Sequence, residues 1–279
     1  MDRFEKPMSW NISSYDEQNS DQGPSHEHGC DQSGADATST RPHLGFGTWD
    51  QVRSQRSFFL PVHYTPSYQY PLVVWLHSDG CNEHQVDQIM PHISLRNHVA
   101  VGVRGNRAAD SSGHRFDWHD SPAAIGIAHD NIADAADEAC DRFSVHSNRI
   151  VLAGYGSGGT MAMRIAMRDP RRFAAAISVG GRMPQGAIRN LNQLRNRRLP
   201  MLWQWGAKNQ NYTNAGLKTD CQVAMAIGAN VEIRQYPGED EMDTVVLADI
   251  DRWIMGHVVS NTAAADERWA TSPTEYSAN

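Results

Sequence analysis

This chain of 279 residues contains few lysines, no closely spaced cysteines and no long apolar run. No run of about 18 apolar residues is present, so a membrane-spanning helix is not predicted. The first ten residues lack the apolar core of an export signal. We therefore expect a cytoplasmic protein that does not act on membranes. The four cysteines are far apart and form no CxxC pair, which favours free thiols over disulfides or a zinc site.

Acidic charge is concentrated at the two ends of the chain, which has a net charge of -7. Residues 1–43 contain eight acidic and three basic residues, and residues 261–279 contain three acidic and one basic residue. The central region is nearly neutral, so nucleic-acid binding is not predicted. Residues 1–43 are also rich in Ser, Asp, Gln and Gly, which predicts a disordered acidic tail. We expect one folded domain over residues 44–260, followed by a second disordered tail.

Short apolar runs alternate with helical patterns through this central region. Buried strands are predicted at residues 70–77, 98–104, 149–153, 173–179, 200–205 and 230–236, with an edge strand at 56–64. Helices are predicted at residues 83–95, 121–143, 160–168, 214–227 and 244–258. Residues 105–120 and 182–198 are expected to be loops. The alternation predicts an α/β fold with a doubly wound, mostly parallel sheet and helices on both faces.

The glycine-dense turn GYGSGG, residues 154–159, joins a predicted strand to a predicted helix. Such turns hold either a phosphate group or a catalytic nucleophile. Dinucleotide binding would need an acidic residue about 20 residues further on to hold the ribose. No Asp or Glu lies between Asp169 and Asp220. We therefore expect no cofactor.

From about Arg56 to Val258 the chain resembles the phospholipase/carboxylesterase group of α/β-hydrolases, which includes the acyl-protein thioesterases. The segments that carry the resemblance are LVVWLHSDGCNE, HVAVGVRG and NRIVLAGYGSGGTMAMRIA. The resemblance implies the α/β-hydrolase fold, with a nucleophile on the glycine turn and a loop that stabilises an oxyanion. It also implies an acid and a histidine that complete a catalytic triad.

Measured against the family pattern, all three triad positions are substituted. The nucleophile position of the family's GFSQGG turn falls on Gly156, the acid position on Asn209 and the histidine position on Asp240. Ser157 follows the nucleophile position by one residue, which turns its side chain by about 100° on the helix. His257 is the only histidine after the turn, and it lies near the end of the last predicted helix. We therefore expect a hydrolase fold without a working triad, in a ligand-binding or interaction role.

Ser78 and Asp79 stand in the family's oxyanion loop, and with Ser157 and Gly158 they are the expected ligand-binding residues. An Asp79 carboxylate that faced the site would oppose a developing oxyanion. The alternative for Asp79 is a solvated turn residue. The free N–H groups at the start of the helix still favour an anion or a carbonyl oxygen. A small acyl or carboxylate ligand is therefore expected.

An active esterase is the alternative function. Ser157 would be the nucleophile, His114 or His119 the base and Asp240 the acid, because loops at the carboxyl ends of parallel strands converge. His114, His119 and Asp120 have no further cluster at ligand spacing, so a metal site is not predicted. The sequence leaves the oligomeric state open, and the resemblance is compatible with a homodimer.

Overall fold

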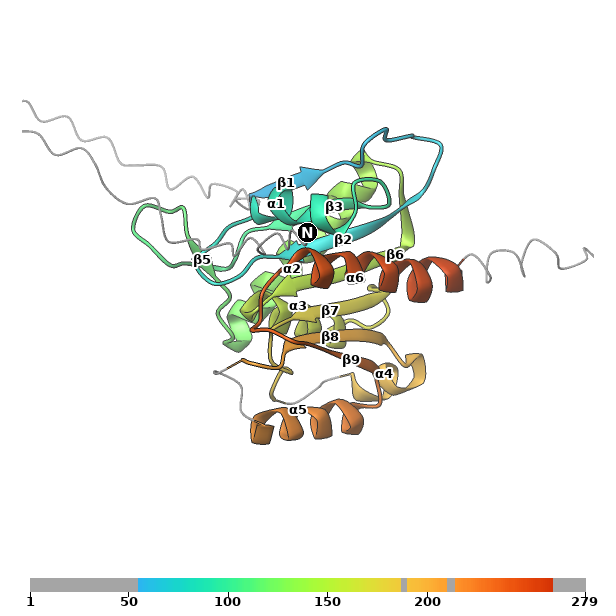
Figure 1. Ribbon diagram of the computed structural model, residues 1–279. Coiled ribbons are helices and arrows are strands. Elements are labelled where there is room, and N and C mark those ends of the chain that lie inside the picture. Colours follow the sequence, from blue (N-terminus) through green and yellow to red (C-terminus); the bar gives the residue numbers. More distant parts are fainter. Residues whose placement is uncertain (1–54, 187–189, 210–213, 263–279) are drawn as a thin grey trace, which may run out of the picture. The chain divides into compact units, whose positions relative to one another are not determined.

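The computed structural model describes residues 55–186, 190–209 and 214–262 (Figure 1). The predicted tail over residues 1–43 lies outside these described residues. The predicted C-terminal tail, residues 261–279, also lies outside them except for Asn261 and Thr262, which are helical. So does the predicted start of the folded domain at residue 44. None of the described helices is long and apolar enough to cross a membrane.

Seven strands form the main sheet in the order β1-β3-β2-β6-β7-β8-β9, and every neighbouring pair is parallel except β1 with β3. The strands are β1 (Arg56–Phe59), β2 (Tyr70–Leu76), β3 (Val99–Val103), β6 (Val145–Tyr155), β7 (Ala175–Val179), β8 (Pro200–Gly206) and β9 (Asn230–Tyr236). Strands β4 (Arg107–Ala108) and β5 (Phe116–Asp117) form a separate two-stranded sheet. The helices are α1 (Gln85–Ile93), α2 (Pro122–Arg142), α3 (Ser157–Arg168), α4 (Leu191–Arg197), α5 (Asn214–Ile227) and α6 (Thr244–Ile254), the last continued by a π-helical turn, Met255–Val259.

Two apolar clusters, one on each face of the sheet, form the core. Alternate residues of β2 point to opposite faces, so Leu72 and Val74 join the cluster with α2, α3 and α5, whereas Val73 and Trp75 join the cluster with α1 and α6. Figure 1 shows α6 lying across one face of the sheet. Because the central strands are buried on both faces, they are continuous apolar runs. The predicted α/β-hydrolase fold is confirmed.

Some local predictions need correction. Helix α2 begins as predicted after Ser121, whose Oγ accepts a hydrogen bond from Ala124 N at 3.3 Å. The segment over residues 182–198, expected to be a loop, contains α4, in which only Leu194 is buried. The predicted loop 105–120 contains β4 and β5. These elements are short and hold few buried apolar residues, so they leave little periodic signal in the sequence.

The parallel arrangement determines where the functional loops lie. The carboxyl ends of β2, β6, β7, β8 and β9 all lie at the same edge of the sheet. The oxyanion-type loop follows β2, the glycine turn follows β6, and the loops with Asn209 and Asp240 follow β8 and β9. Ligands bind at this edge in open α/β sheets.

Candidate functional site

Gly156 forms a sharp elbow between β6 and α3. Its backbone has φ 57° and ψ -122°, a conformation that side chains disfavour. Gly156 N donates to Val179 O at 2.9 Å, which ties the elbow to the end of β7. A Cβ atom built on Gly156 would meet no atom within 4 Å. The elbow therefore directs residue 156 into open space, and this chain has no side chain there; that this is the nucleophile position stays a prediction of the sequence resemblance.

The glycines on either side of the elbow have a packing role. A Cβ atom on Gly158 would lie 2.3 Å from the carbonyl oxygens of both Leu76 and His77, at the end of β2. A Cβ atom on Gly154 would lie 2.6 Å from the Leu76 oxygen. Glycine at these two positions lets the turn and the start of α3 press against β2.

Ser157, the first residue of α3, is joined to Asp79. Its Oγ donates a hydrogen bond to Asp79 Oδ1 at 2.5 Å. Asp79 is thus exposed, as the solvated-turn alternative expects, and its carboxylate also turns toward Ser157. The carboxylate lies beside the positive end of α3, where the helix dipole favours an anion. This position is therefore already held by a negative group of the protein itself, which opposes further negative charge nearby.

Asn209 and Asp240, the predicted acid and histidine positions, are in direct contact. Asn209 Nδ2 donates to Asp240 Oδ2, and Gly206 N donates to Asp240 Oδ1 at 2.6 Å. Burial raises the pKa of Asp240, and the hydrogen bonds from Gly206 and Asn209 oppose that rise. The two residues that the sequence resemblance assigns to the acid and histidine positions are therefore hydrogen-bonded to each other. The pair consists of an amide and a carboxylate and contains no imidazole.

His77, at the end of β2, is a structural residue. Its Nδ1 donates to Ser78 O at 2.7 Å, and its Nε2 accepts from Gly105 N at 2.9 Å. Burial lowers the pKa of His77. Trp118 Nε1 donates to the His77 carbonyl oxygen at 2.9 Å. With both ring nitrogens engaged, the neutral imidazole fixes the start of the loop.

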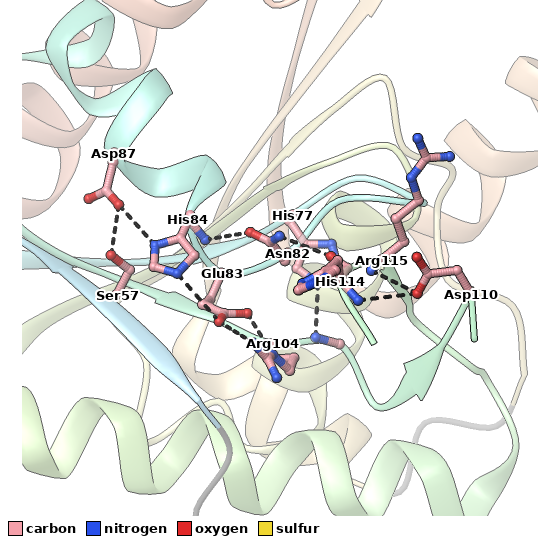
Figure 2. Close-up of polar contacts among 11 residues, drawn as sticks. Ser57, His77, Asn82, Glu83, His84, Asp87, Arg104, Asp110, His114 and Arg115 are labelled. Atoms are coloured by element: carbon pink, nitrogen blue, oxygen red, sulfur yellow. Dashed lines mark hydrogen bonds and ion pairs between the residues drawn. The ribbon is translucent and has the colours of Figure 1, made fainter. Parts of the chain in front are cut away.

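The loop after β2 is held by side chains on all sides, as Figure 2 shows. Glu83 is buried and accepts from Arg104 Nε at 2.7 Å, and Asn82 Nδ2 donates to His114 O at 3.0 Å. Ser78 N donates to Gln85 Oε1 at 3.1 Å. A ligand oxygen at the Ser78 amide would have to displace Gln85, so the oxyanion role of Ser78 stays a prediction.

His114 and His119, the predicted alternative bases, are both exposed. Asp110 Oδ1 accepts from His114 N at 3.2 Å, and His119 Nδ1 accepts from Ser121 N at 3.4 Å. In the part of the chain that the structure describes, no hydrogen bond joins either histidine to Ser157. Within those same residues, no three His, Cys, Asp or Glu side chains gather as a metal site would require.

A cavity of about 440 Å³ opens beside the elbow. It combines two arginines and Asp120, whose carboxylate lies 4.0 Å from Arg164 Nη1, with apolar side chains and with the elbow itself. Its lining includes Gly156, Ser157, Trp118, Met161, Arg164, Arg182, Met183 and Gln185. The volume lies within the range of small-molecule sites. The site is therefore lined by three segments, which are the residues just before α2, the first half of α3 and the loop after β7.

The wall of the cavity after β7 is held by Asp220, a fully buried carboxylate on α5. Asp220 accepts from Met183 N at 3.0 Å and from Gln185 Nε2 at 2.9 Å, and lies 3.9 Å from Arg182 Nε. Sequence reasoning missed this contact, which spans more than 30 residues. A signal for Arg182 was present, because it lies just beyond the carboxyl end of a buried parallel strand.

Solved carboxylesterases share this fold. The Bacillus cereus carboxylesterase superposes with a TM-score of 0.59 at 16% identity, over 74% of this chain and 96% of that chain. The carboxylesterase from Mesorhizobium loti superposes with a TM-score of 0.56 at 18% identity, over 67% of this chain and 88% of that chain. These likenesses confirm the fold implied by the sequence resemblance.

Similarity in sequence extends over shorter ranges. A protein of Nocardia uniformis subsp. tsuyamanensis described as "Putative esterase NocK" is 28% identical over 120 residues, which is 41% of this chain. The match spans 33% of that relative's length. Residues 115–270, more than half of the chain, match the model of the dienelactone hydrolase family, and the match includes the elbow, Asn209 and Asp240. The chain belongs to the dienelactone hydrolase family.

Proposed function

We propose that this α/β-hydrolase-fold protein does not hydrolyse esters and instead binds a small carboxylate-bearing molecule in the cavity beside Gly156. The observation that carries the proposal is the elbow. Gly156 has the strained backbone that presents a nucleophile in this fold, and it has no side chain to present. A strained backbone at Gly156 that presents no nucleophile fits a protein that has kept the hydrolase fold and uses its cavity for binding.

The contacts around the elbow support the loss of catalysis. A serine nucleophile needs a base to take its proton and an acid to orient that base. The residues at the corresponding positions, Asn209 and Asp240, are hydrogen-bonded to each other. Neither is a histidine, so neither can supply the imidazole base. Asp79 places a carboxylate beside Ser157, where a tetrahedral intermediate would develop negative charge.

The cavity supports a carboxylate ligand with an apolar body. Arg164 and Arg182 provide planar guanidinium groups that suit carboxylate geometry. Trp118, Met161 and Met183 provide apolar surface in the same cavity. Because Asp79 already lies at the helix N-terminus, we place the ligand carboxylate at the arginines.

Covalent labelling tests the loss of catalysis. The purified full chain is treated with a fluorophosphonate probe beside an active serine hydrolase, and adducts are located by mass spectrometry. We expect no adduct on the folded protein and the same result for Ser157→Ala. An adduct on Ser157 that disappears in Ser157→Ala contradicts the proposal.

A binding experiment tests the ligand class. Straight-chain carboxylates from butanoate to decanoate, with the matching alcohols as controls, are titrated against the protein by calorimetry. We expect the carboxylates alone to bind, and Arg182→Gln to weaken binding about tenfold or more, since a hydrogen bond to a charged group contributes about 1.5–3 kcal/mol. Arg115→Gln, at an exposed position outside the cavity lining, is the matched control. Equal binding of alcohols and carboxylates contradicts the arginine site.

One observation favours the alternative, an active carboxylic-ester hydrolase that uses Ser157. The 2.5 Å hydrogen bond to Asp79 gives the Ser157 hydroxyl an acceptor for its proton. A carboxylate is ordinarily a much weaker base than an imidazole, so slow turnover is expected in this case. The labelling experiment separates the two functions, because this route requires an adduct on Ser157 that is lost in both Ser157→Ala and Asp79→Asn.

A further inference from the structure

Strand β9 is the last strand of the main sheet in the described part of the chain (Figure 1). It runs for seven residues, Asn230–Tyr236, and pairs with β8 in one unbroken register. Its other side has no strand partner among the described residues. An open edge of this kind presents backbone groups to which another strand can pair.

The hydrogen bonds with β8 show which groups of β9 face outward. Asn230 N donates to Leu199 O at 3.0 Å, and Tyr236 O accepts from Ala207 N at 2.8 Å. In a strand, the N–H and C=O of successive residues point alternately to the two sides. The even-numbered residues therefore bond to β8, whereas Val231, Ile233 and Gln235 direct their backbone N–H and C=O groups outward. The Ile233 side chain is also 42% exposed.

We propose that β9 pairs with β9 of a second copy of this chain, antiparallel and about a twofold axis at Ile233. In this register Ile233 lies opposite Ile233 of the second copy, and Val231 lies opposite Gln235. Every outward N–H then meets an outward C=O, because residues with outward groups face one another in both copies. The two sheets join into one continuous sheet.

Charge on the neighbouring positions selects this register. Glu232 lies opposite Arg234 of the second copy, and Arg234 lies opposite its Glu232. These are the non-hydrogen-bonded positions, at which side chains approach most closely. A shift of two residues in either direction puts Glu232 opposite Glu232 or Arg234 opposite Arg234. A shift of one residue leaves the outward backbone groups unmatched.

The two charged side chains are already held in place on the α6 face of β9. Glu232 Oε2 accepts from Trp253 Nε1 at 2.8 Å, and Arg234 Nη1 donates to Asp249. Within one copy, Arg234 Nε also donates to Glu232 Oε1 at 2.7 Å, so the pairing across the axis would extend this ion pair into a network of four charges. The pairing therefore adds opposite charges to an ordered network. A second copy fits better than an unrelated strand because the edge is complementary to itself, as a twofold interface requires.

Analytical ultracentrifugation of the full chain tests the pairing. Because the edge is only seven residues long, we expect a weak, reversible dimer whose population grows with protein concentration. Ile233→Lys and Ile233→Glu should each be monomeric, because like charges would face each other at the axis, and should keep the circular dichroism spectrum, because the Ile233 side chain is 42% exposed. Met225→Lys, at a residue 82% exposed on α5, is the matched control and should dimerise as the wild type does.

Two further experiments, mixing of the charged variants and disulfide cross-linking, test whether position 233 lies at the twofold axis. Since position 233 meets itself in the proposed register, an equal mixture of Ile233→Lys and Ile233→Glu should recover the dimer. Ile233→Cys should form a dimer linked by a disulfide, because hydrogen-bonded antiparallel partners have α-carbons about 5.5 Å apart, within the range that a disulfide spans. A wild type that stays monomeric throughout, or a dimer that survives Ile233→Lys, overturns the proposal.

Discussion

At the scale of single residues, the strain at Gly156 is open to measurement. We expect Gly156→Ala to lower the free energy of unfolding by about 1–3 kcal/mol, the usual cost of holding a side chain in a sparsely populated backbone region. A steric clash should add nothing, since a Cβ atom there meets no atom within 4 Å. Urea unfolding monitored by circular dichroism measures the change.

Gly126→Ala is the control for that substitution. Gly126 lies within α2, and a Cβ atom there also meets no atom within 4 Å. Alanine in a helix interior is favoured over glycine by about 1 kcal/mol, so this variant should be more stable than the wild type. If both variants shift in the same direction, the elbow backbone is not strained.

Some features of single side chains were not predictable from sequence. Asp79 follows a buried strand in a turn-favouring segment, which fits both an outward and an inward carboxylate. Its direction depends on Ser157, a residue 78 positions away that donates to it. On α2 the large apolar side chain of Ile127 is 54% exposed. The buried stripe instead includes Ala128, because small alanines let α2 approach the sheet.

At the scale of elements, β9 is tied to α6 through Asp249. Tyr236 OH and Arg234 Nη1 both donate to Asp249 Oδ2. Burial and the hydrogen bond to Asp249 raise the pKa of Tyr236 to about 12. The unfolded value is near 10, so the neutral phenol contributes its stabilisation in full below pH 10. That contribution is lost as the pH rises through about 12.

We therefore expect the free energy of unfolding to fall more steeply between pH 10 and 12 in the wild type than in Tyr236→Phe. The phenylalanine variant has no proton to lose at this position, although it should be less stable at pH 8 because it lacks the hydrogen bond. Urea unfolding at several pH values gives both slopes. Tyr68→Phe, at an exposed tyrosine, serves as the control and should keep the wild-type slope. Equal slopes for wild type and Tyr236→Phe contradict the coupling.

The elements that sequence reasoning found and those it missed differ in how much apolar surface they bury. The predicted strands β2, β3 and β7 are buried along their whole length, so their apolar runs are long enough to recognise, whereas β9 is only half-buried. The order of these strands along the chain made it possible to predict which loops hold Gly156, Asn209 and Asp240. Helix α4 buries only Leu194, and its basic, amide-rich sequence is compatible with a loop. The cavity wall depends on Asp220, whose contacts are long-range and leave no local pattern.

At the scale of the whole molecule, the three residues that the sequence resemblance assigns to the triad positions follow three strands that end at the same edge of the sheet. Gly156 follows β6, Asn209 follows β8 and Asp240 follows β9. Asn209 already contacts Asp240, and the cavity beside Gly156 shares Gly180, Gly181 and Arg182 with a small pocket that Asn209 and Asp240 line. We therefore propose that the fold would accept a triad at these three positions.

We expect the triple variant Gly156→Ser, Asn209→Asp, Asp240→His to react with a fluorophosphonate probe at position 156, at least about tenfold faster than the wild type. The gain follows because a complete triad contributes on the order of 10⁶ in kcat in a serine protease and its members act as a unit. Gly156→Ser alone should stay unlabelled, since the side chain at position 240 is still a carboxylate. A folded triple variant without an adduct would show that these positions no longer converge on the elbow. An adduct on Gly156→Ser alone would show that another group of this cavity acts as the base.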